Sequence, residues 1–481
     1  MNDKQSFRLL SLDGGLVTDV SPILLAPDKG FAEEAINLEF SLHGVLRKRP
    51  GTAQVFAPVA TTPIGAHQFV KASTQEVHNV VAHGTVVQRW DSATEAWVDL
   101  QTGLSGAGVD FLTFADSLLM VDGNNPSARW DGITVTTPTQ FPKAKYLAEY
   151  RLRVAAAGDP ANPSKLYISH TGDPELWSTT DSRSNAAELF VSPDDGDVIT
   201  GLCNVGEGGL LVGKQRALYG LFGYSRANFM VDLLDPTVGV GSHKTMLYIR
   251  PYAYFVNQYG VYRMEVGSPA ERISSSIQSV FDDRINRSRI AESRAVLVGR
   301  NYVVTLPTGE TDTFTLAFHV DRLAWCEWTQ PHIQESFLVT DDPTSNVYYF
   351  PRKELHPRKI SQELHFDLLD PIPSSVTFVE SSAGLPEVEK DLNQLYLMCK
   401  AADKPYHINV WAWADDPAWN LWQQVASNLE ISGQKGAQVT HYVPLEASNV
   451  RYFKIKLESV GRGEKFHPMA LTFVYIPKEL W

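Results

Sequence analysis

One segment has the residue types and spacing of a phosphate-binding loop. Gly208–Lys214 reads G-x-x-x-x-G-K, the spacing at which backbone amides can surround a phosphate. Such a loop continues with Ser or Thr to hold Mg²⁺, whereas Gln215 follows here, and Leu210–Val212 is apolar strand sequence. We therefore interpret the segment as a strand and expect no nucleotide site.

Neighbouring acids are the next candidates for chemistry. They occur at Asp194–Asp195, Asp341–Asp342 and Asp415–Asp416, and Ser192–Asp197 resembles a sialidase Asp box in which Ile199 replaces the Trp. Glycoside hydrolysis needs two carboxylates about 5–9 Å apart across a groove, and adjacent acids on a strand point in different directions. We expect solvated turns, with a calcium site as the alternative for any one pair.

The remaining reactive side chains show no enzyme pattern. Thirteen histidines are scattered without an H-E-x-x-H motif, and no G-x-S-x-G elbow occurs. Cys203, Cys326 and Cys399 are far apart among apolar neighbours, which favours buried thiols over metal ligands. We predict a protein that is not an enzyme, with no catalytic residues, metal or cofactor.

Charge and hydropathy exclude other classes. The chain has 42 Lys and Arg against 55 Asp and Glu, a net charge of -13, which is the wrong sign for gripping nucleic acid. No apolar run reaches the length of a membrane span, and no secretory signal is evident. We expect a protein that assembles in a reducing cytoplasm and contacts no membrane.

The elements that carry these residues follow an internal repeat. Arg89–Asp91 recurs as Arg129–Asp131, 40 residues later, each time after an apolar strand and a turn containing Gly. Looser copies continue this unit at steps of 36 to 56 residues. The apolar strands are anchored at Val80, Leu118, Val154, Leu210, Tyr254, Val303 and Val347. A period of this size built only from strands predicts an irregular β-propeller of six or seven blades.

Three regions are expected along an all-β chain. Residues 1–52 form an N-terminal extended arm, residues 53–370 the propeller and residues 371–481 a C-terminal β-sandwich, with Pro371–Ser375 as connector. Helical spacing predicts a short helix within Ser274–Arg294 and another turn or two within Phe31–Phe40.

Two kinds of side chain are candidates for contacts between proteins. Trp411 and Trp413 share one face of a strand, and we interpret them as core, with a carbohydrate-binding platform or a docking surface as the alternative. Trp419 and Trp422 follow in a turn and are candidate contact residues. Basic clusters are candidate contacts to a neighbouring subunit or an adaptor, against the alternative of a solvated face. They are Arg47, Lys48, Arg49, Arg352, Lys353, Arg358 and Lys359.

Four motifs follow one another near the N-terminus: Gly14–Asp19, Leu24–Pro27, Ala35–Glu39 and Gly44–Gly51. They resemble those of bacteriophage tail β-propeller proteins, the family of tail-tube or nozzle proteins of short-tailed phages. Gly158–Trp177 is similar to a recurring hairpin of the propeller, and Tyr452–Lys456 to the end of the C-terminal sandwich of that family. The resemblance covers nearly the whole chain.

The resemblance implies a structural virion protein. Such proteins form rings, commonly hexamers, that continue the DNA channel below the portal and adaptor and bind fibres or spikes. DNA would pass without specific binding, because a wall with net negative charge offers no counterion release. The expected location is the tail of the virion, after assembly in the host cytoplasm. The alternatives are a glycan-binding or glycosidase-type propeller, and a hub or baseplate protein of a long-tailed phage.

Overall fold

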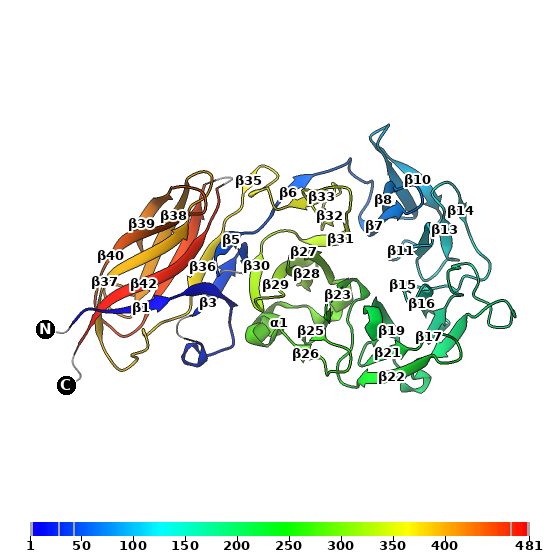
Figure 1. Ribbon diagram of the computed structural model, residues 1–481, viewed down its shortest axis with the longest axis horizontal. Helices are drawn as coiled ribbons and strands as arrows, with labels where there is room; N and C mark the ends of the chain where they lie inside the picture. The colour runs from blue at the N-terminus through cyan, green and yellow to red at the C-terminus, as the bar shows by residue number, and fades with distance from the viewer. Residues whose placement is uncertain (1–2, 27–28, 42–43, 462–463, 479–481) are drawn as a thin grey trace.

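The computed structural model describes residues 3–26, 29–41, 44–461 and 464–478, and these residues form a seven-bladed β-propeller joined to a β-sandwich (Figure 1). The first strand of each blade contacts the first strand of the next, and the last of them contacts that of blade one, which closes the ring. These inner strands are β7 (Pro63–Lys71), β11 (Asp110–Phe114), β15 (Tyr146–Glu149), β19 (Ile199–Asn204), β23 (Leu247–Ile249), β27 (Arg294–Val298) and β31 (Ile333–Leu338).

The second strand of each blade carries the repeat that the sequence revealed. All seven repeat anchors lie in these strands, which confirms the propeller and settles the number of blades at seven. Their side chains are buried on both faces because neighbouring blades cover both sides, so the strands are almost continuously apolar. They are β8 (Glu76–His83), β12 (Ser117–Val121), β16 (Val154–Asp159), β20 (Leu210–Lys214), β24 (Tyr252–Asn257), β28 (Asn301–Thr308) and β32 (Val347–Pro351).

The third and fourth strands complete each blade toward the outside. The repeated Arg-Trp-Asp segments lie in equivalent third strands, β9 and β13. The third strands are β9 (Val86–Asp91), β13 (Ala128–Trp130), β17 (Asn162–Ile168), β21 (Leu218–Phe222), β25 (Gly260–Met264), β29 (Asp312–His319) and β33 (Arg358–Ser361). The fourth strands of blades one to six are β10 (Ala96–Thr102), β14 (Val135–Thr136), β18 (Ala187–Phe190), β22 (Met230–Asp235), β26 (Glu271–Arg272) and β30 (Ala324–Trp328).

The seventh blade takes its fourth strand from the N-terminal region. β6 (Gly51–Gln54) pairs antiparallel with β33, and the short hairpin of β34 (Phe366–Asp367) and β35 (Asp370–Pro371) continues that sheet. The chain therefore closes the propeller by joining its beginning to the last blade, and the segment predicted as an arm is built into both domains.

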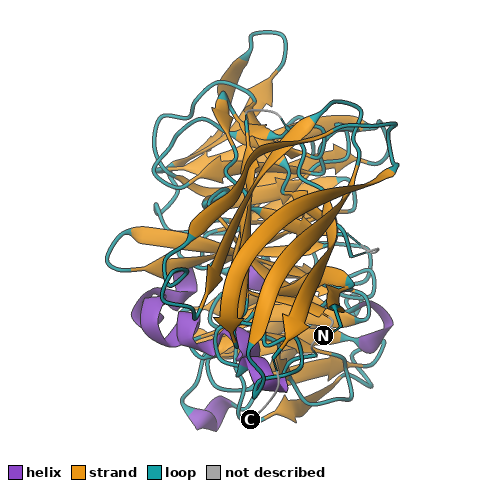
Figure 2. Ribbon diagram, turned by 90° about the vertical axis from the view of Figure 1, so that its left-hand side faces the viewer, coloured by secondary structure: helices purple, strands orange, loops and turns teal. Residues whose placement is uncertain are grey.

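The sandwich has two sheets, whose long strands lie in front of the propeller in Figure 2. One sheet has the order β1 (Gln5–Leu9), β42 (Pro468–Pro477), β37 (Lys390–Lys400), β40 (Gln438–Val450). The other has the order β3 (Lys29–Ile36), β36 (Ser375–Phe378), β41 (Phe453–Val460), β38 (Tyr406–Ala414), β39 (Gln423–Ile431).

The second sandwich sheet is continuous with blade six. β3 pairs with β36 on one side and meets β30 on the other through the bridge between Ile36 and Glu327, while β2 (Ser11–Leu16) runs parallel to β3. A small hairpin of β4 (Leu38–Phe40) and β5 (Leu46–Lys48) follows. One hydrophobic core accordingly extends from blades five to seven into the sandwich.

Helices are few among the described residues. The helix expected within Ser274–Arg294 is present as α1 (Gln278–Arg284), which buries Val280 and Phe281 and is flanked by 3-10 turns. The helical turn expected within Phe31–Phe40 is wrong, because the segment forms β3 and β4. Its residues pair with strands more than 280 positions away, and local spacing does not report such pairing.

Candidate functional site

Asn37 sits at the joint between propeller and sandwich. It has a left-handed backbone, φ 55°, between β3 and β4. Its Nδ2 donates to the carbonyl of Pro373 at 2.6 Å, and its Oδ1 accepts from the amide of Thr329 at 2.8 Å. One side chain thus connects the N-terminal region, the end of blade six and the connector to the sandwich.

Arg49 completes this joint from inside the protein. The residue is fully buried, its Nε donates to Oδ1 of Asn37 at 2.8 Å, and its Nη1 donates to Asp367 at 3.0 Å in a two-pronged ion pair. Two residues later, a side chain at Gly51 would lie 2.3 Å from the carbonyl oxygen of Phe366. The close approach of the two backbones requires Gly at this position.

The N-terminal motifs that carry the family resemblance form this joint. A side chain at Gly14 would meet the backbone of Gly30 at 2.7 Å, and Gly15 has φ 78° against Ala324 of blade six. Pro27, part of one motif, lies outside the described residues. Gly14 and Gly15 of these motifs therefore fix how the N-terminal strands pack against each other and against blade six.

Three of the basic residues predicted to contact partners are buried in the chain. Arg49 bonds Asn37 and Asp367, Arg358 pairs with Glu354 with 8% exposure, and Lys48 is 4% exposed. These three predictions need correction, because such side chains stabilise the fold and are inaccessible to another protein. Sequence alone does not reveal this, since the acid bound by Arg49 lies 318 residues away.

Lys48 is a buried cation without a hydrogen-bond partner at its Nζ. Burial lowers the pKa of Lys48 to about 8, although Glu464 acts in the opposite direction. The Nδ1 atom of His365 is also buried without a hydrogen-bond partner, and burial lowers the pKa of His365, to which the charges of Lys465 and Lys48 add. Lys48 and His365 are thus buried basic groups whose charged forms are disfavoured, with Glu464 as the counter-charge near Lys48.

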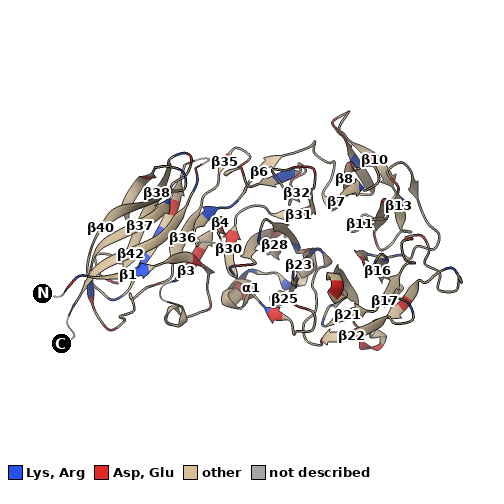
Figure 3. Cartoon of the chain, viewed as in Figure 1, with Lys and Arg blue, Asp and Glu red and all other residues tan. Residues whose placement is uncertain are grey.

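The other predicted basic residues are paired at the surface. Arg352 pairs with Glu292, Lys353 with Asp312 at 2.7 Å and Lys359 with Asp342 at 3.0 Å. Exposed pairs of this kind contribute little to stability and can exchange partners. Of the basic set, Arg47 and Lys353 are exposed. Charges of both signs are distributed over both domains rather than gathered on one of them (Figure 3).

The tryptophans of the sandwich are arranged opposite to the prediction. Trp411 and Trp413 lie on the outer face of β38 and are partly exposed, because Val410, Ala412 and Ala414 take the inward positions. Trp419 packs against the core, while Trp422 is 39% exposed. The strict alternation in β38 was evident from the sequence, but it does not tell which face is inward.

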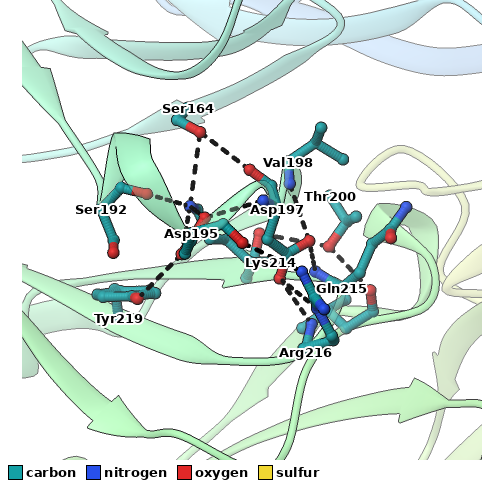
Figure 4. A network of polar contacts seen from close by, with 12 residues as sticks. Ser164, Ser192, Asp195, Asp197, Val198, Thr200, Lys214, Gln215, Arg216 and Tyr219 are labelled. Atoms are coloured by element: carbon teal, nitrogen blue, oxygen red, sulfur yellow. Dashed lines mark hydrogen bonds and ion pairs between the residues drawn. The ribbon is translucent and has the colours of Figure 1, made fainter.

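Leu210–Lys214 forms a strand, as the sequence predicted, just after a 3-10 turn over Gly206–Gly208. Lys214 lies at the end of β20 with its side chain fully buried, and its Nζ donates to both carboxylate oxygens of Asp195, at 2.7 and 2.8 Å (Figure 4). Ser192 accepts a third bond through its carbonyl, at 2.9 Å. This network ties the turn before blade four to its second strand and leaves the ammonium no room for a phosphate.

The acidic pairs lie in turns that are largely exposed, as expected, and several of their carboxylates also bind neighbouring groups. Asp195 binds Lys214, and Asp342 binds Lys359. Asp341 accepts a bond from Gln68 of blade one at 2.7 Å and so helps to close the ring. Asp415 accepts from the amides of Arg451 and Tyr452 at 3.0 and 3.1 Å. Among the described residues, no group of three or more His, Cys, Asp or Glu gathers as a metal site would.

Near the propeller axis, a buried carboxylate links several blades. Asp110 of β11 accepts from Lys244 and His243, each at 3.1 Å, and from the amide of Leu147 at 2.8 Å. Burial alone would raise the pKa of Asp110, but Lys244 and His243 outweigh it and hold that pKa well below its usual range. Burial lowers the pKa of nearby His67 to about 4. The cluster has its charges paired and stabilises the inner strands.

A small cavity of about 180 Å³ adjoins this cluster. His243, Lys244, Arg294 and Glu335 contribute to its lining, and Arg294 pairs with Glu335 at 3.1 Å. The charged groups of the lining are paired across blades, so we interpret the cavity as part of the polar packing between blades.

The three cysteines are buried free thiols, as predicted. Burial raises the pKa of Cys203, Cys326 and Cys399 to about 12 each. Cys326 also serves the joint, since its thiol donates to the carbonyl of Ala35 at 3.3 Å. Within the part of the chain that the structure describes, no helix has the length and apolar character needed to cross a membrane.

The chain matches no described protein family, and no curated protein is similar to it. Solved structures with a similar arrangement of strands include U3-55K, at 7% identity and a TM-score of 0.41, covering 65% of this chain and 99% of that one. YCF48 bound to D1 peptide has 9% identity and a TM-score of 0.41, covering 66% and 100%.

A third similar structure is the extracellular domain of the putative one-component system BT4673 from B. thetaiotaomicron. It has 12% identity and a TM-score of 0.44, covering 91% of this chain and 63% of that one. Likeness at these values says nothing about function. The blade order and ring closure of this chain establish the propeller.

Proposed function

We propose that this chain is a structural, non-enzymatic protein of a bacteriophage tail that assembles into a ring around the DNA exit channel. The observation that carries the proposal is the position of the motifs that resemble the tail β-propeller family. Gly14, Gly15, Asn37, Arg49 and Gly51 lie together at the joint between the domains. These motif residues therefore hold the propeller and the sandwich together, and a subunit of a ring needs such a fixed arrangement of its domains.

The joint would keep the two domains of such a subunit in one orientation under mechanical force. The sheet of blade six continues through β3 into the sandwich, so no flexible linker separates the domains. The indole of Trp328 donates to the carbonyl of Leu38 at 2.8 Å, and the amide of Asn37 donates to that of Glu327 at 2.8 Å. A subunit with this joint would keep the relative orientation of its domains while neighbours hold it in a ring.

Contacts to neighbours or adaptors are assigned to the exposed basic members of the predicted set, Arg47 and Lys353. The net charge of -13 suits a channel wall that DNA passes without sticking, because a wall of net negative charge offers little counterion release. A ring whose inner wall proved basic would contradict this part of the proposal.

Light scattering on the purified chain, alone and with tail adaptor complexes, tests the proposal. We expect a 53.4 kDa monomer that becomes a ring when adaptors are present. Arg47→Glu and Lys353→Glu together should weaken this association, whereas the exposed and unassigned Lys404→Glu should not. A chain that stays monomeric with every adaptor complex would overturn the proposal.

A further inference from the structure

The outer face of the second sandwich sheet contains a groove of about 550 Å³, a volume within the range of small-ligand sites. Four adjacent strands form its floor, and their pairing places Glu34, Thr377, Lys456 and Trp411 in one row across the sheet. Trp422, just before β39, forms part of the wall. The groove belongs to neither the joint nor the propeller axis.

Its aromatic groups are positioned as binding surfaces. The indole N–H of Trp411 donates to Glu458 at 2.8 Å, which holds that ring in place along the groove. Trp422 is 39% exposed, and its indole N–H meets no acceptor within the part of the chain that the structure describes. Water can satisfy this exposed N–H, so both the ring and its donor are accessible to a ligand.

The polar groups of the groove are fixed by one another. Lys456 contacts Glu458 at 2.9 Å and Glu34 at 3.8 Å, and the hydroxyl of Thr377 donates to Glu34 at 3.0 Å. Glu33, also in the lining, pairs with Lys454 at 2.7 Å. Each carboxylate keeps free lone pairs, so the groove offers several hydrogen-bonding positions that do not need to reorganise.

The charge pattern bears on the class of ligand. The three carboxylates Glu33, Glu34 and Glu458 repel an anion, and a cation gains little from them because Lys454 and Lys456 already pair with them. An uncharged molecule with many hydroxyls can donate to the carboxylates, accept from Lys456 and pack its C–H faces on the indoles. We propose that this groove binds an uncharged saccharide, a function separate from ring assembly.

The proposal is tested on the purified full-length chain without any tail partner. Wild type is applied to a printed array of neutral and acidic oligosaccharides that includes maltoheptaose and chitohexaose, and the strongest binder is measured by calorimetry. We expect a neutral saccharide to bind, and Trp422→Ala to weaken its affinity by at least about tenfold. Leu421→Ala is the matched control, because Leu421 is 76% exposed beside Trp422 but does not line the groove.

Variants of the floor separate binding from folding. Trp411→Phe removes the donor to Glu458 but keeps an aromatic ring, and Glu34→Gln keeps the shape of the side chain; both should weaken binding while the melting temperature stays near that of wild type. No binder on the array, preference for acidic saccharides, or equal affinity in Trp422→Ala and Leu421→Ala would overturn the proposal. So would loss of ring assembly in Trp422→Ala with saccharide binding intact, because the groove would then be a protein interface.

Discussion

The guanidinium of Arg49 and the side-chain amide of Asn37 bond at 2.8 Å inside the protein, where propeller, sandwich and N-terminal region meet. Arg49 also pairs with Asp367, next to the strand that closes the seventh blade. This single contact connects ring closure to the attachment of the second domain. It explains why residues near the N-terminus control the architecture of the whole chain.

Removing the buried guanidinium should destabilise the protein strongly. Arg49→Met leaves Asp367 without its cation and removes one of the hydrogen bonds to Asn37, and loss of one member of a buried ion pair typically costs about 3–5 kcal/mol. Thermal unfolding followed by circular dichroism measures the effect. Arg47→Met is the matched control, since that residue is exposed two positions away, and it should unfold within about a degree of wild type. Equal melting temperatures for the two variants would contradict the assigned role of Arg49.

The charge of Lys48 should destabilise the folded protein, whereas that of Arg49 stabilises it. The pKa of Lys48, about 8, lies below its ordinary value of 10.5, so the folded state releases the proton before the unfolded state does. The charge therefore costs stability in full below about pH 8, and the cost disappears as the pH rises toward 10.5.

The corresponding variant is Lys48→Met. It should raise the melting temperature at pH 7 by removing a cost of about 3 kcal/mol, and the gain should shrink at pH 10. The exposed Lys404→Met provides the control and should change little at either pH. A gain from Lys48→Met that is the same at both values would show that apolar packing, not charge, is responsible.

Closure of the seventh blade depends on the close approach at Gly51. Gly51→Ala places a Cβ 2.3 Å from the carbonyl of Phe366 and should cost about 1–3 kcal/mol, as overpacking does. Gly108→Ala is a matched substitution, because its nearest neighbour would lie at 3.8 Å. Limited proteolysis should cut the Gly51 variant first near β6. If both variants resist protease equally, Gly51 does not govern closure.

Lys214 should stabilise the folded protein and should not bind nucleotides. Lys214→Met leaves Asp195 without its cation and should lower the melting temperature, while Lys214→Met with Asp195→Leu should recover part of the loss. Differential scanning fluorimetry with and without Mg-ATP completes the test. We expect no shift with ATP in wild type. A clear ATP-dependent stabilisation that Lys214→Met abolishes would restore the phosphate-loop interpretation.

The propeller could be predicted because each blade repeats its own local pattern. Val80, Leu118 and Val303 begin or lie in apolar strands that are buried on both faces, and a continuous apolar run near a turn is visible in one sequence. The number of blades stayed open, since β6 lies some 300 residues before the blade that it completes. Ring closure is a long-range pairing, and no local repeat contains it.

The contact residues were harder to predict for the same physical reason. Arg49 looks like a surface cation until Asp367, 318 residues away, is placed beside it; Arg358 pairs with the nearby Glu354, and only its burial by other strands depends on the fold. For Trp411 and Trp413, the alternation predicts one shared face, but the small residues between them go inward because the sandwich core accommodates them there. Side-chain size and hydropathy did not determine which face is exposed.

The most direct test of the central claim is the mass and shape of the assembly formed with adaptors. Light scattering, with electron microscopy of the same sample, should show a closed ring of this chain on the adaptor complex, each subunit with its sandwich fixed to blade six. Arg49→Met should fail to form the ring at temperatures where it has lost the joint. A wild-type chain that remains a 53.4 kDa monomer with every adaptor complex would contradict the account.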